Sequence, residues 1–211
     1  WFSAGDPPPR AEPLPRFIDD AAAAKLLRAA REHSDPFTRL AVEFLARTGL
    51  RRGEFLDLKI DSVVQIGAAY WLHVPLGKLR TDRYIPLHPQ LKELLDEWVA
   101  RRPASLREPW LFMDHGRRLG PESVRQALLN VAEQAGLGTV TPHQLRHRLA
   151  TQAINRGMSL EAIAALLGHK SMRMTMVYAK ISNRTVADEY FRVSEQVEAL
   201  HDAPKELPAE A

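Results

Sequence analysis

Residues 60–87, IDSVVQIGAAYWLHVPLGKLRTDRYIPL, interrupt an otherwise helical pattern. They contain three runs rich in β-branched and aromatic residues, SVVQI, YWLHV and RYIPL, and the joints between the runs contain glycine. Such runs are typical of strands, and glycine-containing joints of this length favour antiparallel hairpins. We therefore predict a small antiparallel sheet at this point of the chain.

Helical patterns lie on both sides of this predicted sheet. Asp35 followed by Pro36 is a typical helix start, and the apolar periodicity that follows ends at Gly49. Thr141 followed by Pro142 marks another start of the same kind. The helices predicted in this way cover residues 20–33, 36–48, 90–101, 121–134, 142–156, 159–168, 171–179 and 183–199. The predicted fold class is therefore α+β, mainly α-helical with a small antiparallel β-sheet.

Length and composition limit the class of protein. The chain has 211 residues, of which 45% are hydrophobic and 26% charged, so one domain with a real core is expected. No apolar run approaches the ~20 residues that span a bilayer, so no membrane association is expected. Cysteine is absent, which excludes disulfide scaffolds, thiolate metal sites and cysteine nucleophiles. The net charge of +3 is only a weak indication of a nucleic-acid partner.

The two ends of the chain differ from its middle. Five of the fifteen prolines fall within residues 1–16, so residues 1–18 are predicted to be an extended interdomain linker. The chain starts with Trp1 and carries no targeting signal, which suggests a piece cut from a longer protein. Residues 19–200 form the predicted domain, and residues 201–211 a flexible C-terminal tail.

Four strings gather Arg, Lys, His and Tyr around predicted turns. They are TGLRRGEF at 48–55, GKLRTDRYIPL at 77–87, TPHQLRHRLAT at 141–151 and LLGHKSMRMTMVYAKI at 166–181. Each alone has an ordinary structural explanation, such as a cation at a helix C-terminus, a charged hairpin tip or a core tyrosine. Together they supply what metal-free transesterification of a phosphodiester requires: cations for the phosphate, a hydroxyl that attacks, and a proton donor for the leaving oxygen.

A metal site is the alternative that the histidines leave open. His143 and His147 are four residues apart on a predicted helix, which is metal-ligand spacing, and His169 could be a third ligand. A zinc hydrolase would want a glutamate next to the first histidine, where this chain has Gln144. A zinc-dependent hydrolase is therefore kept as an alternative hypothesis.

In these four strings the chain resembles the tyrosine recombinases, also called the phage integrase family. The family's T-G-L-R-x-x-E box is matched at 48–54, and its β-hairpin box at 77–87. Its H-x-L-R-H box is matched at 143–147, and its L-G-H box at 167–169, nine residues before Tyr178. The resemblance is ordered along the chain and covers roughly residues 19–200. It implies the catalytic-domain fold of this family and site-specific DNA recombination, such as integration or excision.

The resemblance also implies which residues make and break bonds. Tyr178 would be the nucleophile that forms a 3′-phosphotyrosyl bond and frees a 5′ hydroxyl. Lys78 would protonate the leaving 5′ oxygen, and His143 would assist proton transfer at the nucleophile. Attack by a 5′ hydroxyl from a partner strand would then reseal the DNA. This chemistry, like that of type IB topoisomerases, uses no metal and no cofactor.

The same resemblance assigns the phosphate-binding residues. Arg51 and Arg146 would clamp the scissile phosphate, and His169 would donate a further hydrogen bond to it. Glu54 would support these side chains without touching the DNA. Contacts to the DNA backbone are expected, from sequence proximity alone, at Arg80, Arg83, Lys170 and Arg173.

The expected partner is double-stranded DNA, and the full-length protein would form a homotetramer on it. The helix at 183–199 would dock onto a neighbouring protomer, or else pack on its own domain. By resemblance the protein would act in the cytoplasm of a prokaryotic cell, on its nucleoid or a mobile element. A DNA-binding module of the same fold that no longer catalyses is the second hypothesis. Its weakness is that all six catalytic side chains are present.

Overall fold

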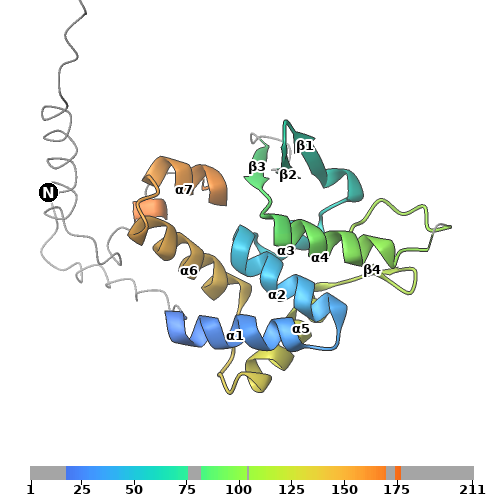
Figure 1. Cartoon of the computed structure of the whole chain (residues 1–211), viewed down its shortest axis with the longest axis horizontal. Coiled ribbons are helices and arrows are strands. Elements are labelled where there is room, and N and C mark those ends of the chain that lie inside the picture. The colour runs from blue at the N-terminus through green and yellow to red at the C-terminus, as the bar shows by residue number, and fades with distance from the viewer. Residues whose placement is uncertain (1–17, 76–81, 104, 170–173, 177–211) are drawn as a thin grey trace, which may run out of the picture.

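The computed structural model describes residues 18–75, 82–103, 105–169 and 174–176 of the chain. Helices predominate in this part, and two small antiparallel sheets accompany them (Figure 1). The mainly helical α+β class predicted from the sequence is therefore confirmed. Across these described residues, no helix is both long and apolar enough to cross a membrane.

Six of the described helices begin and end close to the predicted residues, whereas α3 and η1 were not predicted. The described helices are α1 (Asp20–Glu32), α2 (Pro36–Thr48), α3 (Arg52–Leu56), the 3₁₀ helix η1 (Ile60–Ser62), α4 (Pro89–Ala100), α5 (Pro121–Gln134), α6 (Pro142–Asn155) and α7 (Leu160–Leu167). At the start of α2, the Asp35 carboxylate accepts a hydrogen bond from the Thr38 backbone N–H at 2.9 Å. At the start of α6, Thr141 and Gln144 bond each other's backbone N–H reciprocally. Both predicted N-caps are therefore confirmed.

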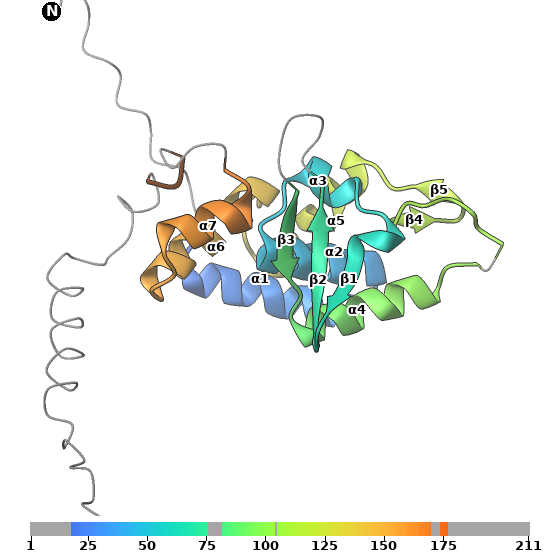
Figure 2. The ribbon, with the colours of Figure 1, turned by 90° about the horizontal axis from the view of Figure 1, so that it is seen from above.

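The predicted sheet is present with three antiparallel strands in the order β1 (Val63–Ile66), β2 (Ala69–Val74) and β3 (Arg83–Pro86). Figure 2 shows the three strands side by side. Leu72 of β2 lies opposite Val63 on one side and Ile85 on the other, and both Leu72 and Ile85 are buried. A second sheet, formed by β4 (Met113–Asp114) and β5 (Arg117–Arg118), was not predicted.

Helix α2 forms the centre of the domain. Ten of its 13 residues are buried, and it packs against α1, α4, α5 and α6 (Figure 1). Phe44 of α2 meets Phe55 of α3 edge-on, and Phe55 stacks on Phe112 with 4.0 Å between ring centroids. Because α2 is held on all sides, its C-terminal end is a rigid point from which the next residues project.

Helix α2 ends at Gly49, and helix α7 ends at Gly168. Both glycines are left-handed, each with φ of 63°. A Cβ at Gly49 would lie 2.7 Å from the Leu167 side chain and 2.9 Å from that of Leu149, so the ends of α2 and α7 are in direct contact. Only glycine meets both conditions, a positive φ and this close approach.

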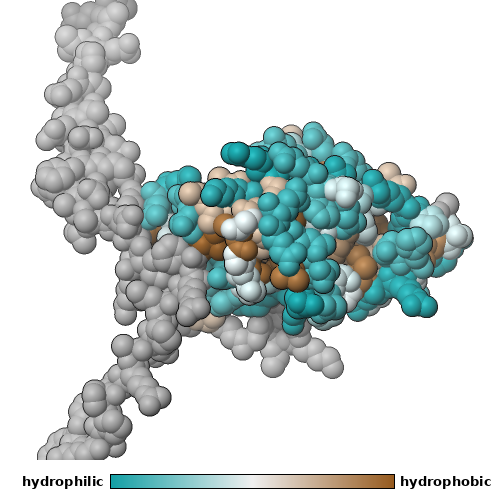
Figure 3. Space-filling model, turned by 90° about the horizontal axis from the view of Figure 1, so that it is seen from below, coloured by the Kyte–Doolittle hydropathy of each residue, from teal (hydrophilic) through white to brown (hydrophobic). Residues whose placement is uncertain are grey.

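Some predictions concern residues that are not described. The linker at 1–18 lies outside the described residues apart from Ile18, and so do the helix at 183–199 and the tail at 201–211. Of the helix predicted at 171–179, residues 174–176 are described and are helical. One face of the molecule is mostly hydrophilic, with hydrophobic patches near its middle (Figure 3), as is usual for a folded domain.

Candidate active site

Arg146 joins three of the four segments that carry predicted site residues. It lies on α6, is 3% exposed, and donates hydrogen bonds from Nη1 to the Gly49 carbonyl and from Nη2 to the Leu167 carbonyl, both at 2.6 Å. These carbonyls stand at the ends of α2 and α7. One guanidinium therefore connects parts of the chain that are 97 and 21 residues away from it.

Arg51 follows the end of α2 and is held by Glu54 on the first turn of α3. Its backbone N–H donates to Glu54 Oε2 at 2.9 Å, and its Nη1 donates to Oε1 at 2.8 Å. The Arg51 side chain is 40% exposed, so its guanidinium is both anchored and accessible from solvent. This is the arrangement that a phosphate-binding arginine requires.

Glu54 also binds a second arginine, Arg83. Arg83 Nη2 donates to Glu54 Oε2 at 2.8 Å and Nη1 donates to Oε1 at 3.2 Å. Burial of the carboxylate acts to raise its pKa, but the hydrogen bonds from Arg83 and Arg51 and the charge of Arg83 outweigh this effect and hold the pKa of Glu54 at about 2. Glu54 is therefore an anion that binds two arginines.

His143 and His147 face each other across one turn of α6. Their Nε2 atoms are 2.6 Å apart and the rings meet edge to face. Burial lowers the pKa of both imidazoles, to about 4 for His147, and repulsion by neighbouring positive charge, including that of Arg146, acts in the same direction. A pair with lowered pKa values is neutral at pH 7, so one ring donates and the other accepts the shared hydrogen bond.

His169 follows Gly168 at the end of α7. Its Nδ1 lies 2.8 Å from the hydroxyl of Thr175, which is fully buried. Burial and the charge of Arg146 lower the pKa of His169 to about 4, and the charges of Arg51 and Arg83 act in the same direction. The three arginines and His169 therefore converge on one region, with a net positive charge suited to an anion.

Five of the predicted site residues lie outside the described residues: Lys78, Arg80, Lys170, Arg173 and Tyr178. The structure brings together the other predicted residues: Arg51, Glu54, Arg83, His143, Arg146 and His169. Arg83 differs from its predicted position, because it is 6% exposed and paired with Glu54 rather than on the surface. The alternation along β3 indicates this, since Arg83 shares a buried face with Ile85.

Two contacts of the site were not predicted from the sequence. His147 is the hydrogen-bond partner of His143, and Thr175 is the partner of His169. The spacing of His143 and His147 indicated a shared face, and it was interpreted as metal-ligand spacing. Within the described part of the chain, no group of three or more His, Cys, Asp or Glu side chains could hold a metal ion. The zinc-hydrolase hypothesis therefore finds no ligand set there.

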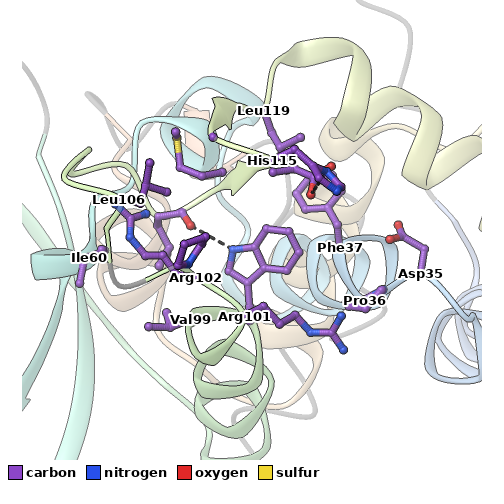
Figure 4. Close-up of a pocket in the computed structure, with 16 residues that line it drawn as sticks. Asp35, Pro36, Phe37, Ile60, Val99, Arg101, Arg102, Leu106, His115 and Leu119 are labelled. Atoms are coloured by element: carbon purple, nitrogen blue, oxygen red, sulfur yellow. Dashed lines mark hydrogen bonds and ion pairs between the residues drawn. The ribbon is translucent and has the colours of Figure 1, made fainter.

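A pocket of about 370 Å³ lies away from this site (Figure 4). It is lined by Phe37 at the start of α2, by Trp98 of α4 and by residues around β4, including His115. Helix α2 is 13 residues long, so its two ends are about 20 Å apart at 1.5 Å per residue. The pocket is therefore separate from Arg51 and Arg146, which lie at the other end of α2.

The histidines make the stability depend on pH. Unfolded His147 and His169 take up protons near pH 6.5, whereas in the folded protein their pKa values are about 4. The unfolded chain thus binds more protons as the pH falls from about 6.5 to about 4, and the folded state loses stability in this window. We expect the free energy of unfolding in urea to drop by on the order of 2 kcal/mol between pH 7.5 and pH 4.5.

The variant His147→Asn, measured in the same way, should show a smaller drop because one of the three histidines with a lowered pKa is gone. The carboxylate of Glu54 does not disturb the comparison, since its contribution is lost mainly below pH 4.5 and is the same in both proteins. A free energy of unfolding that stays flat or rises as the pH falls would contradict this account of the histidines.

Comparison with known proteins identifies the family. Residues 16–184 match the phage integrase family. The chain is 34% identical over 178 residues to tyrosine recombinase XerC of Herpetosiphon aurantiacus, covering 81% of this chain and 57% of the relative. It is 32% identical to tyrosine recombinase XerA of Pyrococcus furiosus, covering 86% of this chain and 63% of the relative. The chain thus spans about three fifths of the length of these relatives.

Solved structures show the same fold. The XerH site-specific recombinase bound to its difH substrate, in a pre-cleavage complex, has a TM-score of 0.70 at 26% identity, covering 79% of this chain and 50% of XerH. The catalytic domain of bacteriophage HP1 integrase has a TM-score of 0.59 at 23% identity, covering 92% of this chain and 98% of that domain. With the family match over most of its length and the site built around Arg146, the chain belongs to the phage integrase family.

Proposed function

We propose that this chain is the catalytic part of a tyrosine-type site-specific recombinase, which cuts and rejoins double-stranded DNA through a 3′-phosphotyrosyl intermediate. The observation that carries the proposal is the arrangement around Arg146. This guanidinium connects the ends of α2 and α7, and its charge acts on His143, His147 and His169. Such a cluster of fixed donors and cations is suited to a phosphate that gains negative charge in its transition state.

In the proposed reaction, the Tyr178 oxygen attacks the scissile phosphorus and the bond from phosphorus to the 5′ oxygen breaks. The hydroxyl proton passes toward His143, which is neutral at pH 7 because burial and repulsion by Arg146 and Arg51 lower its pKa. Lys78 gives a proton to the leaving 5′ oxygen. Arg51 and Arg146 hold the non-bridging oxygens, and His169 donates to one of them.

The reverse reaction completes the exchange. A 5′ hydroxyl from another strand attacks the phosphotyrosine, releases Tyr178 and reseals the DNA, so the energy of the phosphodiester is conserved. No nucleotide or metal is needed for this cycle. We propose that the full-length protein acts as a homotetramer on DNA in the cytoplasm of a prokaryotic cell. The remaining predicted contacts, Arg80, Lys170 and Arg173, would bind the DNA backbone.

The proposal is tested by trapping the covalent intermediate. A pool of nicked DNA fragments from the source genome is incubated with the 211-residue chain in EDTA. Cleavage next to a nick releases a short strand, so the adduct accumulates and survives denaturing electrophoresis. We expect an EDTA-resistant adduct, and sequencing its DNA identifies the site. If neither this chain nor the full-length protein forms an adduct although both bind DNA, the non-catalytic DNA-binding module is the better account.

A further inference from the structure

Arg83 is a third arginine of the site, and its contacts lie inside the protein. It is on β3, is 6% exposed, and makes a two-pronged hydrogen bond with the two oxygens of Glu54, at 2.8 and 3.2 Å. The same carboxylate binds the side chain and the backbone N–H of Arg51. Arg83 therefore fixes the orientation of the group that anchors Arg51.

Arg83 also touches the turn that carries His169. A Cβ placed on Gly168 would collide with the Arg83 guanidinium and lie 3.2 Å from its Cδ, so the glycine backbone rests directly on this side chain. Helix α7, which ends at Gly168, packs on β3. The position of His169, one residue further on, thus depends on the volume and orientation of Arg83.

We propose that Arg83 is a positioning residue for the proposed recombination reaction: it holds the Glu54–Arg51 pair on one side and the Gly168–His169 turn on the other, without contacting DNA. This inference rests on the proposed function. It replaces the DNA backbone contact that sequence proximity predicts for Arg83.

The chemistry of the guanidinium explains why an arginine suits this position. A buried ion pair stabilises a fold little more than apolar residues of the same volume would, so stability alone gives weak grounds for it. A planar guanidinium, however, meets both carboxylate oxygens at once and fixes their plane, which an ammonium group cannot do. Arg83 can therefore fix the direction of Glu54, and through it that of Arg51, while the same side chain lies against Gly168.

The test separates positioning from DNA binding. Two quantities are measured for Arg83→Lys and Arg83→Met. The first is the single-turnover rate of adduct formation at saturating protein, on nicked DNA of the sequence that the trapping experiment identifies. The second is the salt dependence of binding to a 30-base-pair duplex of arbitrary sequence. We expect the rate to fall about 100-fold for Arg83→Met and less for Arg83→Lys. The log–log salt slope should stay unchanged. A phosphate contact would instead reduce the slope by about 0.9 and leave the saturated rate unchanged.

A second variant guards against simple loss of folding. Arg83→Met alone leaves Glu54 without its buried partner and should lower the melting temperature by about 10 °C. In Glu54→Gln combined with Arg83→Met, the partly buried carboxylate that has lost one of its two arginines is itself neutralised, so at least half of this loss should be recovered. The rate of adduct formation should stay low in the double variant, because Arg51 and Gly168 still lack their support.

The matched control is Arg125→Gln. Arg125 pairs with Glu122 on α5, where both side chains are more than half exposed. The rate of adduct formation by Arg125→Gln should therefore stay within about twofold of the wild type. Recovery of the rate together with stability in the double variant would overturn the inference, and so would a reduced salt slope for Arg83→Met. If neither this chain nor the full-length protein forms an adduct, the proposed function fails, while the salt-slope and melting measurements still test the position of Arg83.

Discussion

Tyr178→Phe should bind DNA like the wild type and form no covalent adduct. The substitution removes only the hydroxyl oxygen that would bond to phosphorus, so adduct formation should fall at least about 10⁴-fold. A phenol carries no charge at neutral pH, so the affinity for a DNA duplex and its salt dependence should not change. The adduct is measured by denaturing electrophoresis with the nicked substrate, and binding by filter retention at several salt concentrations.

Tyr190→Phe is the matched control, because it makes the same change 12 residues further along the chain. It should form the adduct at the wild-type rate. Mass spectrometry of the digested adduct should find the nucleotide on Tyr178 alone. Adduct that persists in Tyr178→Phe, or is attached to Tyr190, would refute the assignment of the nucleophile.

Local signals predicted most of the helices correctly. An N-cap before a proline marks the starts of α2 and α6, and a glycine ends α2 and α7, so these boundaries depend on backbone chemistry within a few residues. The sheet was predicted from its β-branched runs. Helix α3 and the β4–β5 hairpin were not predicted because they are only five residues and two plus two residues long. Such short elements form through tertiary contacts, such as the hydrogen bond from Arg118 to the Leu56 carbonyl.

The sequence identified the types of residue at the site better than their environments. Arg51 and Arg83 are both arginines in family-like strings, yet one is 40% exposed and the other 6% exposed. The difference arises because α7 packs on β3 and covers Arg83, and no pattern local to residues 77–87 specifies that packing. Helix geometry predicts that His143 and His147 lie on the same face of α6. It does not distinguish a metal site from a hydrogen-bonded pair, because both have the same spacing.

Arg146→Lys should lower the rate of adduct formation about 1,000-fold, measured in single turnover at saturating protein. A lysine keeps the positive charge but cannot donate in two fixed directions, so it cannot replace both bonds to the Gly49 and Leu167 carbonyls. The ends of α2 and α7 then lose their common partner, and with it the relative position of Arg51 and His169. The free energy of unfolding in urea should also fall, by about 2 kcal/mol, because a buried carbonyl loses its donor.

Arg148→Lys controls for the substitution itself, since Arg148 lies on the same helix and pairs with Asp20 near the surface. The rate of adduct formation by Arg148→Lys should stay within about threefold of the wild type. The decisive comparison for Arg146 is between stability and rate. A loss of about 2 kcal/mol leaves a protein of ordinary stability almost entirely folded, so it cannot account for a 1,000-fold slower reaction. If the rate falls only in proportion to the folded fraction, Arg146 serves the fold alone. A large fall at full folding means that the same guanidinium that joins the two helix ends also serves the reaction, by holding the phosphate or by placing Arg51 and His169 around it.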